Sequence, residues 1–480
     1  MPIHQGTAGF RAGCSRDRTG RHPGGGGKED GGLGRAPRWV VRNKGKTNFP
    51  TRFGRWAYHL DAMPTVIQKF GGTSLVNREA VVRCARRIAT RHEHGDRVVV
   101  VVSAMGETTD RLVEQGRMMN PDGNRREFDL LMAAGEQVSA ALMALALESL
   151  GVGATALTGA QAGFMTDEVH GRARIKDIRT SRLASELDAD RVPVVMGFQG
   201  VTNEGELTTF GRGGSDTTAV ALAAALNVAA EGGYCEINTD VAGIHTADPR
   251  LIAEARRLDQ ISYEEMLELA LHGARVMDPR ALVFGEKYSV PILVRHSTRP
   301  GAGTLITSME EDMERPSVVG CALKEDIGRI ALSVPAGESG AQAAIFEATA
   351  RAGIVVDDII QTEHDGRVHV AFTVEHADLA VVRTAISESL DDLGGGHTDP
   401  EVEIGLAKVS AVGTGMKTHT GIASRMFGAL ADRSIPIRNI TTSEIKISCL
   451  VPQEHGVRAL EAVHQCFDLG MPATENAREG

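Results

Sequence analysis

The sequence predicts a doubly wound α/β domain followed by two small α+β domains. Between residues 63 and 308, short apolar runs alternate with helical stretches, and glycine-rich turns follow the apolar runs. Beyond residue 320, the order strand, helix, strand, strand, helix occurs twice. Such alternation predicts a parallel sheet between layers of helices, and a repeated unit indicates tandem domains. We expect the two repeats to occupy residues 320–400 and 401–480.

Charge separates a basic N-terminal segment from the rest of the 480-residue chain. Residues 1–62 hold 12 Lys and Arg against 4 Asp and Glu, a net of +8, so the total of −10 leaves −18 for the remainder. The segment has no periodic apolar pattern and no signal-peptide core. We interpret it as a disordered extension, or as sequence upstream of a true start at Met63. A nucleic-acid-binding arm is the less favoured alternative.

Cysteine spacing and hydropathy indicate where the protein works. The six cysteines are scattered without a C-x-x-C pair, which is typical of a reducing compartment and argues against a disulfide framework or a structural zinc site. No apolar run approaches the length of a membrane span. We therefore expect a cytoplasmic protein with no metal-ligating cluster and with neither membrane nor nucleic acid as partner.

The first strand–turn–helix unit has a lysine at its turn. An apolar strand over residues 65–68 leads into residues 69–74 (KFGGTS), and Asn77 starts a helix. The spacing is not that of a Walker A loop, and a lysine followed by two glycines is alone a weak signal. The next strand, residues 97–102, consists almost entirely of valine and ends at Ser103. An open α/β sheet places its ligands at such strand ends.

A helix predicted over residues 127–150 has Glu136 in its middle. The residues three and four positions away are small or apolar, namely Met132, Ala133, Ser139 and Ala140. A buried carboxylate needs a cation or a hydrogen bond, since an unpaired one costs roughly several kcal/mol. We expect a substrate ammonium or hydroxyl group as its partner. The alternative is a glutamate at the helix edge that reaches water.

The most informative stretch is a glycine turn that feeds a helix. An apolar strand over residues 192–198, a polar turn and a short run at 207–210 lead to residues 211–215 (GRGGS), and Asp216 starts the helix. Free N–H groups and the positive end of the helix dipole favour an anion there. Arg212 adds a bidentate clamp for a carboxylate or phosphate. An ordinary strand-to-helix turn is the alternative.

The remaining elements complete the α/β domain and the repeats. We expect a strand over residues 235–238, a helix over 263–274 and a strand over 291–294. Residues 300–303 and the charged residues 310–315 are expected to form a linker. The first repeat is predicted from residues 329–334, 340–352, 354–361, 367–374 and 377–390. The second repeat is predicted from residues 408–412, 421–432, 437–442, 445–451 and 456–467.

Six motifs stand in the order found in aspartate kinases, which this sequence resembles from about residue 66 to its C-terminus. They are residues 69–74 (KFGGTS), 103–105 (SAM), 135–137 (GEQ), 157–163 (LTGAQAG), 210–217 (FGRGGSDT) and 246–250 (TADPR). The resemblance implies an amino-acid-kinase-like sheet over residues 63–308, and the repeats are similar to paired ACT domains of βαββαβ type.

The resemblance also implies a role for individual residues. Catalysis would involve Lys69, Arg212 and Asp216. Aspartate would be bound by Thr73, Ser74, Glu136, Arg212, Gly213 and Gly214. ATP, carried with Mg²⁺, would be bound by Lys69, Phe70, Gly71, Gly72, Ser103, Ser215, Thr239, Asp240, His245, Arg250 and Arg275.

Four positions in the expected nucleotide-binding region depart from the family pattern. Asn238 and His245 stand where tyrosines are usual, Ala242 replaces an aspartate and Arg275 replaces a lysine. These departures concern adenine packing and nucleotide affinity more than the chemistry. In the first repeat, residues 334–340 lack the usual aspartate, which bears on feedback behaviour.

The activity that the resemblance implies is transfer of phosphate from ATP to the side-chain carboxylate of L-aspartate. The product, 4-phospho-L-aspartate, leads to lysine, threonine and methionine. A carboxylate is already ionised at neutral pH, so the reaction needs positioning and positive charge rather than a general base. The repeats would bind lysine or threonine and join chains into a homo-oligomer. Two alternatives stay open: a kinase of this fold for another acceptor (glutamate, acetylglutamate or a nucleotide), and a catalytically silent ACT-domain sensor.

Overall fold

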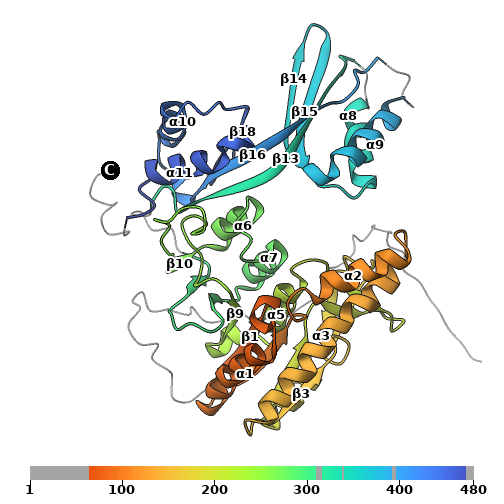
Figure 1. Cartoon of the computed structure of the whole chain (residues 1–480), viewed down its shortest axis with the longest axis vertical. Coiled ribbons are helices and arrows are strands. Elements are labelled where there is room, and N and C mark those ends of the chain that lie inside the picture. Colours follow the sequence, from red (N-terminus) through yellow and green to blue (C-terminus); the bar gives the residue numbers. More distant parts are fainter. Residues whose placement is uncertain (1–63, 310–315, 338–339, 392–395, 472–480) are drawn as a thin grey trace, which may run out of the picture. The chain divides into compact units, whose positions relative to one another are not determined.

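The computed structural model describes residues 64–309, 316–337, 340–391 and 396–471 (Figure 1). The interpretation of the basic segment concerns residues 1–62, which lie outside the described residues.

The first sheet has eight strands, and its neighbours run parallel except for one antiparallel pair, β11 with β12. Its strands in spatial order are β10 (Gln260–Ile261), β12 (Thr304–Ile306), β11 (Ile292–His296), β9 (Tyr234–Thr239), β1 (Thr65–Phe70), β2 (Arg97–Val102), β6 (Val192–Met196) and β3 (Ala154–Leu157). The helices of this part are α1 (Arg78–Glu93), α2 (Thr108–Met119), α3 (Arg125–Glu148), α4 (Ser181–Asp188), α5 (Gly214–Ala225), α6 (Tyr263–Leu271) and α7 (Pro279–Tyr288).

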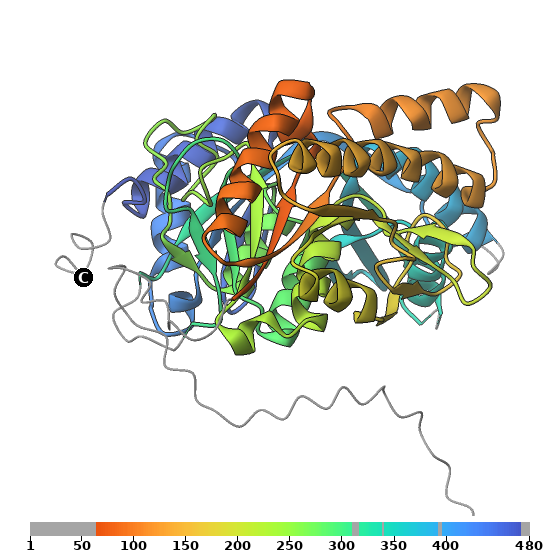
Figure 2. The same ribbon diagram turned by 90° about the horizontal axis from the view of Figure 1, so that it is seen from below.

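The valine strand β2 shows why the central strands are apolar throughout. Val99 and Val101 belong to the core that includes α5, whereas Val98, Val100 and Val102 belong to the core under α1 and α3. Figure 2 shows α1 and α3 side by side on one face of the sheet. Side chains alternate across a strand, so a strand covered on both faces must be apolar at every position. The predicted doubly wound α/β class is confirmed.

A second, four-stranded sheet was not predicted. Its order is β5 (Ile175–Ile178), β4 (Phe164–Thr166), β7 (Gln199–Val201) and β8 (Leu207–Thr209). Residues 199–206, predicted as a polar turn, instead form β7 and the hairpin turn that joins it to β8. Strands of three or four residues are too short to show a period in the sequence.

The C-terminal residues form one antiparallel sheet of six strands. Its order is β14 (Asp357–His364), β15 (Arg367–Glu375), β13 (Gly320–Pro335), β16 (Glu401–Val412), β18 (Lys446–Pro452) and β17 (Asn439–Thr442). The helices are α8 (Ala341–Arg351) and α9 (Leu379–Asp391), which form one core, and α10 (Ile422–Asp432) and α11 (Gly456–Cys466), which form another.

The two repeats share their central strands. The first half of β13 pairs with the end of β16, while its second half pairs with β15 and with the start of β16. Both strands are therefore longer than predicted, since the predictions covered only residues 329–334 and 408–412. The fourth strand of the first repeat is the start of β16, and the fourth strand of the second repeat is the start of β13. Each four-stranded half of the sheet is therefore complete only when both repeats fold together.

Helix α3 is long and apolar enough to cross a membrane by length and composition, which the sequence prediction did not anticipate. Half of its most apolar window is buried inside the protein. Ala140, Met143 and Leu147 of this helix belong to the core shared with α1, and Asp129 and Glu136 are buried on it. The apolar composition of α3 is therefore that of a core helix in a folded domain.

Candidate active site

Four loops begin side by side at the carboxyl ends of the central strands. Hydrogen bonds continue between them beyond the strands: Ser103 N donates to Phe70 O (3.1 Å), and Gly197 N donates to Val102 O (3.0 Å). On the other side of β1, Gly71 N donates to Asn238 O at 3.4 Å. The loops after β1, β2, β6 and β9 therefore form one edge, as expected for an open parallel sheet.

Lys69 and Asp216 form an ion pair at this edge. Lys69 lies near the end of β1, Asp216 lies in the first turn of α5, and Nζ is 2.6 Å from Oδ1. Both side chains are nearly buried, with exposed fractions of 12% and 10%. The pair fixes a lysine ammonium beside a helix N-terminus, where the positive end of the helix dipole also favours an anion.

The loop after β1 leaves no room for a side chain at Gly72. A Cβ atom on Gly72 would lie 2.8 Å from Ala104 O and 3.0 Å from Gly106 O. Gly106 N in turn donates to Gly72 O at 3.0 Å. The residues of the 69–74 motif thus pack directly against the loop after β2, which contains Ser103.

The turn before α5 is held by Asp278, which was not singled out in the sequence. Its Oδ1 caps helix α7 by accepting from Arg280 N (3.0 Å) and also accepts from Thr217 Oγ1 (3.2 Å). Gly213 has a φ of 73°, and a Cβ there would lie 2.2 Å from Asp278 Oδ2. Burial and, second, the neighbouring Asp216 carboxylate raise the pKa of Asp278. An aspartate directly before a proline is a sequence signal for a helix start, so the cap on α7 was predictable. The contact of Asp278 with the turn before α5 was not.

Glu136 is buried beside the same loops, with an exposed fraction of 3%. Its Oε1 accepts a hydrogen bond from Ala104 N at 3.0 Å. Its Oε2 is buried and has no hydrogen-bond partner among the residues that the structure describes. Burial raises the pKa of this carboxyl to about 7. The alternative of a glutamate that reaches water is therefore wrong, and one oxygen is available to a ligand.

Asp129 lies two helical turns before Glu136 on α3 and was not singled out in the sequence. It is fully buried, and its two oxygens accept from Gly171 N (3.0 Å), Thr209 N (3.2 Å) and Thr209 Oγ1 (2.5 Å). His170 Nδ1 lies 2.9 Å from Oδ2. Asp129 thereby fixes the end of β8, and with it the start of the glycine turn. The spacing of seven residues from Glu136 was the only available sequence signal, because it places both on one helix face.

Arg212 is exposed and lines a pocket of about 380 Å³ beside the turn. The other lining residues are Arg172, Arg174, Phe210, Gly211 and Arg280.

The remaining predicted residues differ in burial and in hydrogen bonding. Ser74 is buried and its hydroxyl has no hydrogen-bond partner among the described residues, whereas Thr73 is exposed. Ser215 is buried in the first turn of α5. Thr239 ends β9, and its Oγ1 donates to Asp240 Oδ1 at 3.0 Å.

Three predicted nucleotide residues are not brought into contact with the lysine–aspartate pair. His245 Nδ1 lies 3.1 Å from Gly243 O, and burial lowers the pKa of this histidine. Arg250 pairs with Asp248 at 2.6 Å, and Arg275 is exposed. In the described part of the chain, no hydrogen bond or ion pair joins them to Lys69 or Asp216. Asn238, one of the four departures, is fully buried, and its side-chain amide has no hydrogen-bond partner among the described residues.

This arrangement defines a class of protein. A parallel sheet presents a lysine, glycine turns and a helix N-terminus at one edge, with a buried carboxylate and an arginine nearby. Residues 64–296 match the amino acid kinase family, and residues 409–467 match the ACT domain. The first part of the chain is thus an amino acid kinase domain.

Whole-length relatives narrow the class further. The chain is 44% identical to aspartokinase 2 of Bacillus subtilis over 408 residues, which cover 85% of this chain and 98% of the relative. It is 43% identical to an aspartokinase of Thermus thermophilus over 410 residues, which cover 85% of this chain and 99% of that relative. The structure of Escherichia coli aspartokinase III with aspartate and ADP has a TM-score of 0.69 at 27% identity and covers 84% of this chain and 99% of that one. This chain belongs to the aspartokinase family, as its motifs predicted.

Proposed function

We propose that the protein transfers the γ-phosphoryl group of ATP to the side-chain carboxylate of L-aspartate. The observation that carries the proposal is the buried Glu136 Oε2, which has no hydrogen-bond partner among the described residues, on a carboxyl group held by the loop after β2. The ammonium group of an amino acid supplies such a partner. The related aspartokinase III structure contains aspartate and ADP, the acceptor and the spent donor of this reaction.

The phosphates of ATP are proposed to lie between the 69–74 loop and the start of α5. Lys69 faces the transferred phosphoryl group, and Asp216 keeps its ammonium in place through the 2.6 Å ion pair. Mg²⁺ bound with ATP supplies further positive charge to the phosphate oxygens. The other nucleotide contacts are proposed for Phe70, Gly71, Gly72, Ser103, Ser215, Thr239, Asp240, His245, Arg250 and Arg275.

Aspartate is proposed to lie over helix α3. Glu136 binds its ammonium group and Arg212 binds a carboxylate, with Thr73, Ser74, Gly213 and Gly214 around it. One oxygen of the β-carboxylate attacks the γ-phosphorus while the bond to ADP breaks and its electron pair leaves with ADP. No proton is transferred, so the protein's part is to align the reactants and to stabilise the phosphoryl charge.

An ADP-release assay with aspartate, with glutamate and with no acceptor tests this function. Release that depends on aspartate supports it. Release with glutamate but not aspartate would identify a kinase of the same fold for another acceptor. If neither acceptor raises ADP release above that of the reaction without acceptor, the result would favour a catalytically silent ACT-domain sensor.

The substrate contacts predict a change in KM. Glu136→Ala and Arg212→Ala should each raise the KM for aspartate roughly tenfold or more, with a smaller effect on kcat, because each removes a charged contact present in the ground state. Glu148→Gln, at an exposed position on the same helix, is the matched control. Unchanged aspartate KM values in both alanine variants would remove the basis of the substrate assignment.

The pKa of Glu136 predicts a pH dependence of aspartate binding. The free carboxyl has a pKa raised to about 7 by burial, and only its ionised form attracts an ammonium group. The KM for aspartate should therefore rise roughly tenfold as the pH falls from about 8 to about 6. In Glu136→Gln this rise should disappear. A rise of the same size in both proteins would mean that another group titrates.

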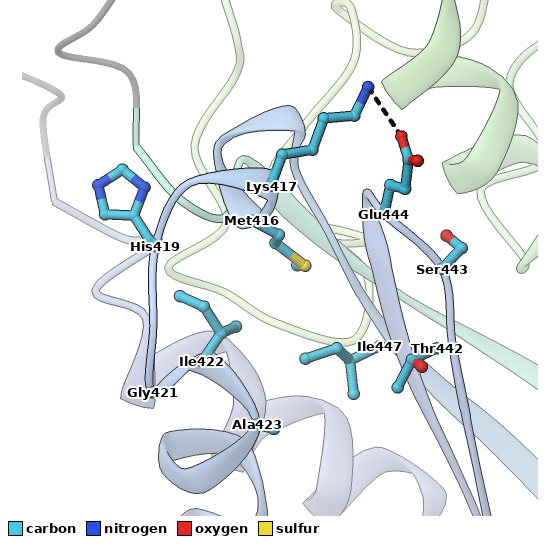
Figure 3. Close-up of a pocket in the computed structure, with 10 residues that line it drawn as sticks. All are labelled: Met416, Lys417, His419, Gly421, Ile422, Ala423, Thr442, Ser443, Glu444 and Ile447. Atoms are coloured by element: carbon cyan, nitrogen blue, oxygen red, sulfur yellow. Dashed lines mark ion pairs between the residues drawn. The ribbon is translucent and has the colours of Figure 1, made fainter.

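For the C-terminal sheet we propose binding of an amino-acid effector and pairing with a second chain. The second repeat has a pocket of about 530 Å³. Lys417 and Glu444, two of its lining residues, form an ion pair of 3.2 Å, and Figure 3 shows their charged ends turned toward each other. A charged pair of this kind offers partners to both the carboxylate and the ammonium of an amino acid. A related structure of E. coli aspartokinase III contains lysine and aspartate.

Residues beside this pocket contact helix α6 of the kinase domain. Thr414 Oγ1 donates to Glu265 Oε1 at 2.7 Å, and Lys446 Nζ lies 3.2 Å from Glu268 Oε2. A ligand that moves either segment therefore acts directly on a kinase-domain helix, and an allosteric coupling of about 1–3 kcal/mol is the usual scale. Assays with lysine and threonine, separately and together, test the regulation. If neither amino acid changes the rate of ADP release and calorimetry detects no binding, the C-terminal sheet would have only the role of pairing with a second chain.

The pairing role rests on the sheet edges. Strands β14 and β17 end the six-stranded sheet, and Val355 and Ile359, just before and within β14, are 81% and 53% exposed. Open edges with exposed apolar side chains favour association with another copy. The molar mass in solution, measured by light scattering, distinguishes a monomer from an oligomer.

A further inference from the structure

The loop that follows β9 is held at its ends by the kinase domain. Leu258 N donates to Ile244 O at 2.8 Å, and Ile244 N donates to Thr304 Oγ1 at 2.9 Å. Residues 245–256, all of which the structure describes, contain neither a helix nor a strand longer than a single bridge. We call them the 245–256 loop. An irregular loop of this length needs contacts outside itself to keep one conformation.

The middle of the 245–256 loop is packed into the second repeat. Ala247 and Ile252 are buried and belong to the same apolar core as helices α10 and α11. Cys321 N, at the start of β13, donates to Thr246 O at 2.8 Å. The loop therefore takes its shape at the middle from the second repeat, and only at its ends from the kinase domain.

One hydrogen-bonded pair joins the 245–256 loop to helix α11. His464 Nε2 lies 3.0 Å from Thr246 Oγ1, and both side chains are buried. The same hydroxyl accepts from Arg256 N at 3.2 Å, and Thr246 N donates to Arg256 O at 2.9 Å. A threonine hydroxyl can donate once and accept twice, so it serves the histidine and the opposite side of the loop together. Burial lowers the pKa of His464, so the ring is neutral near pH 7 and needs no counter-ion.

The loop held in this way carries two of the proposed nucleotide contacts. His245 precedes Thr246 directly, and Arg250 follows it by four residues. The hydrogen bond to Asp248 raises the pKa of Arg250, and the charge of Asp240, the residue after β9, acts in the same direction as a smaller cause. Arg250 thus lies close enough to the carboxyl end of β9 to interact with Asp240. Its guanidinium is 85% exposed and can reach the phosphates of a nucleotide there.

We propose that the second repeat completes the nucleotide site, with His464 as a positioning residue that acts through Thr246. The histidine does not touch the nucleotide, and it fixes where the loop presents His245 and Arg250. The inference rests on the proposed function, because it assumes that ATP binds along this loop. Aspartate is proposed to bind at other loops, so losing the contact should affect the two substrates differently.

Steady-state kinetics of full-length variants test the proposal. His464→Leu and Thr246→Val each remove the hydrogen bond between helix and loop and leave an apolar side chain in the buried position. Each should raise the KM for ATP roughly tenfold or more, while kcat and the KM for aspartate stay within about threefold of the wild type. Thr246→Ser keeps the hydroxyl and should stay close to the wild type.

The matched control for a general loss of stability is Leu430→Ala. Leu430 lies on α10, fully buried in the same core, and its apolar side chain makes no hydrogen bond to the loop. The variant should lower the urea midpoint of unfolding at least as much as Thr246→Val does, yet leave the KM for ATP within about twofold of the wild type. If it raises the KM for ATP as much as His464→Leu, the loop responds to any loosening of the repeat, and His464 is not a positioning residue.

Calorimetry with ADP measures the same effect without turnover. The dissociation constant of ADP should rise roughly tenfold in His464→Leu and in Thr246→Val. An unchanged KM for ATP and unchanged ADP binding in His464→Leu, or equal rises in the KM values for ATP and aspartate, would overturn the proposal. A wild-type chain that phosphorylates no acceptor, but whose ADP binding weakens in these variants, would reject the proposed function alone.

Discussion

Lys69→Ala is expected to lower kcat by roughly a hundredfold or more and to change the KM for aspartate little. The ammonium of Lys69 lies 2.6 Å from Asp216 at the start of α5, where the phosphoryl group is proposed to pass. Charge develops on the phosphoryl oxygens mainly in the transition state. A cation fixed beforehand at that position stabilises the transition state more than the bound substrates, so its loss affects kcat most.

Removing Lys69 also leaves Asp216 without its cation, and the double variant Lys69→Ala/Asp216→Asn separates the two effects. If the loss comes from the missing ammonium, the double variant stays as slow as the single one. If it comes from repulsion between Asp216 and phosphate, the double variant recovers most of the rate. Lys176→Ala, at an exposed position on β5, is the control for losing a lysine. A kcat within about threefold of the wild type in Lys69→Ala would contradict the assignment.

The sequence was sufficient for features that depend on neighbouring residues. The all-valine strand predicted a sheet covered on both faces, and Val98 to Val102 do alternate between two cores. The glycine turn predicted a helix that starts at Asp216, and helix α5 begins two residues earlier, at Gly214. Glu136 proved buried, as its apolar neighbours indicated. In each case, the chemical cause lies within a few positions of the residue concerned.

Features that depend on distant residues were not predicted. Asp278 reaches Gly213 and Thr217 only because α7 packs against α5, some sixty residues apart in the chain. Asp129 meets Thr209 across eighty residues. The exchange of strand halves between β13 and β16 likewise arises from pairing of whole repeats. Such contacts follow from the folded topology, and a single sequence contains no local signal for them.

A second large effect is expected at Glu236 in the kinase sheet. This carboxylate lies on β9 with an exposed fraction of 1%. It is 2.8 Å from Arg87, 3.8 Å from Arg91 and 3.9 Å from Arg295, and Gln68 Nε2 donates to it at 3.2 Å. Through it, helix α1 is tied to strands β9 and β11, whose carboxyl ends adjoin the proposed nucleotide site.

Glu236→Ala is therefore expected to lower the free energy of unfolding by about 3–5 kcal/mol, because Arg87 and Arg295 lose the buried charge that offsets their desolvation. Arg91 keeps its pair with Asp96 at 2.9 Å. Glu236→Gln, which keeps the shape and one acceptor, should also destabilise, since the charge is what the arginines require. Unfolding in urea, followed by circular dichroism, measures both losses.

The control is Asp188→Ala. Asp188 pairs with Arg97 at 2.7 Å, but its side chain is 73% exposed, so the free energy of unfolding should change little. If Glu236→Ala lowers the free energy of unfolding no more than this control does, the network does not stabilise the fold. Water, or for Arg87 the carbonyl oxygens of His296 and Ser297, would then compensate the arginine charges.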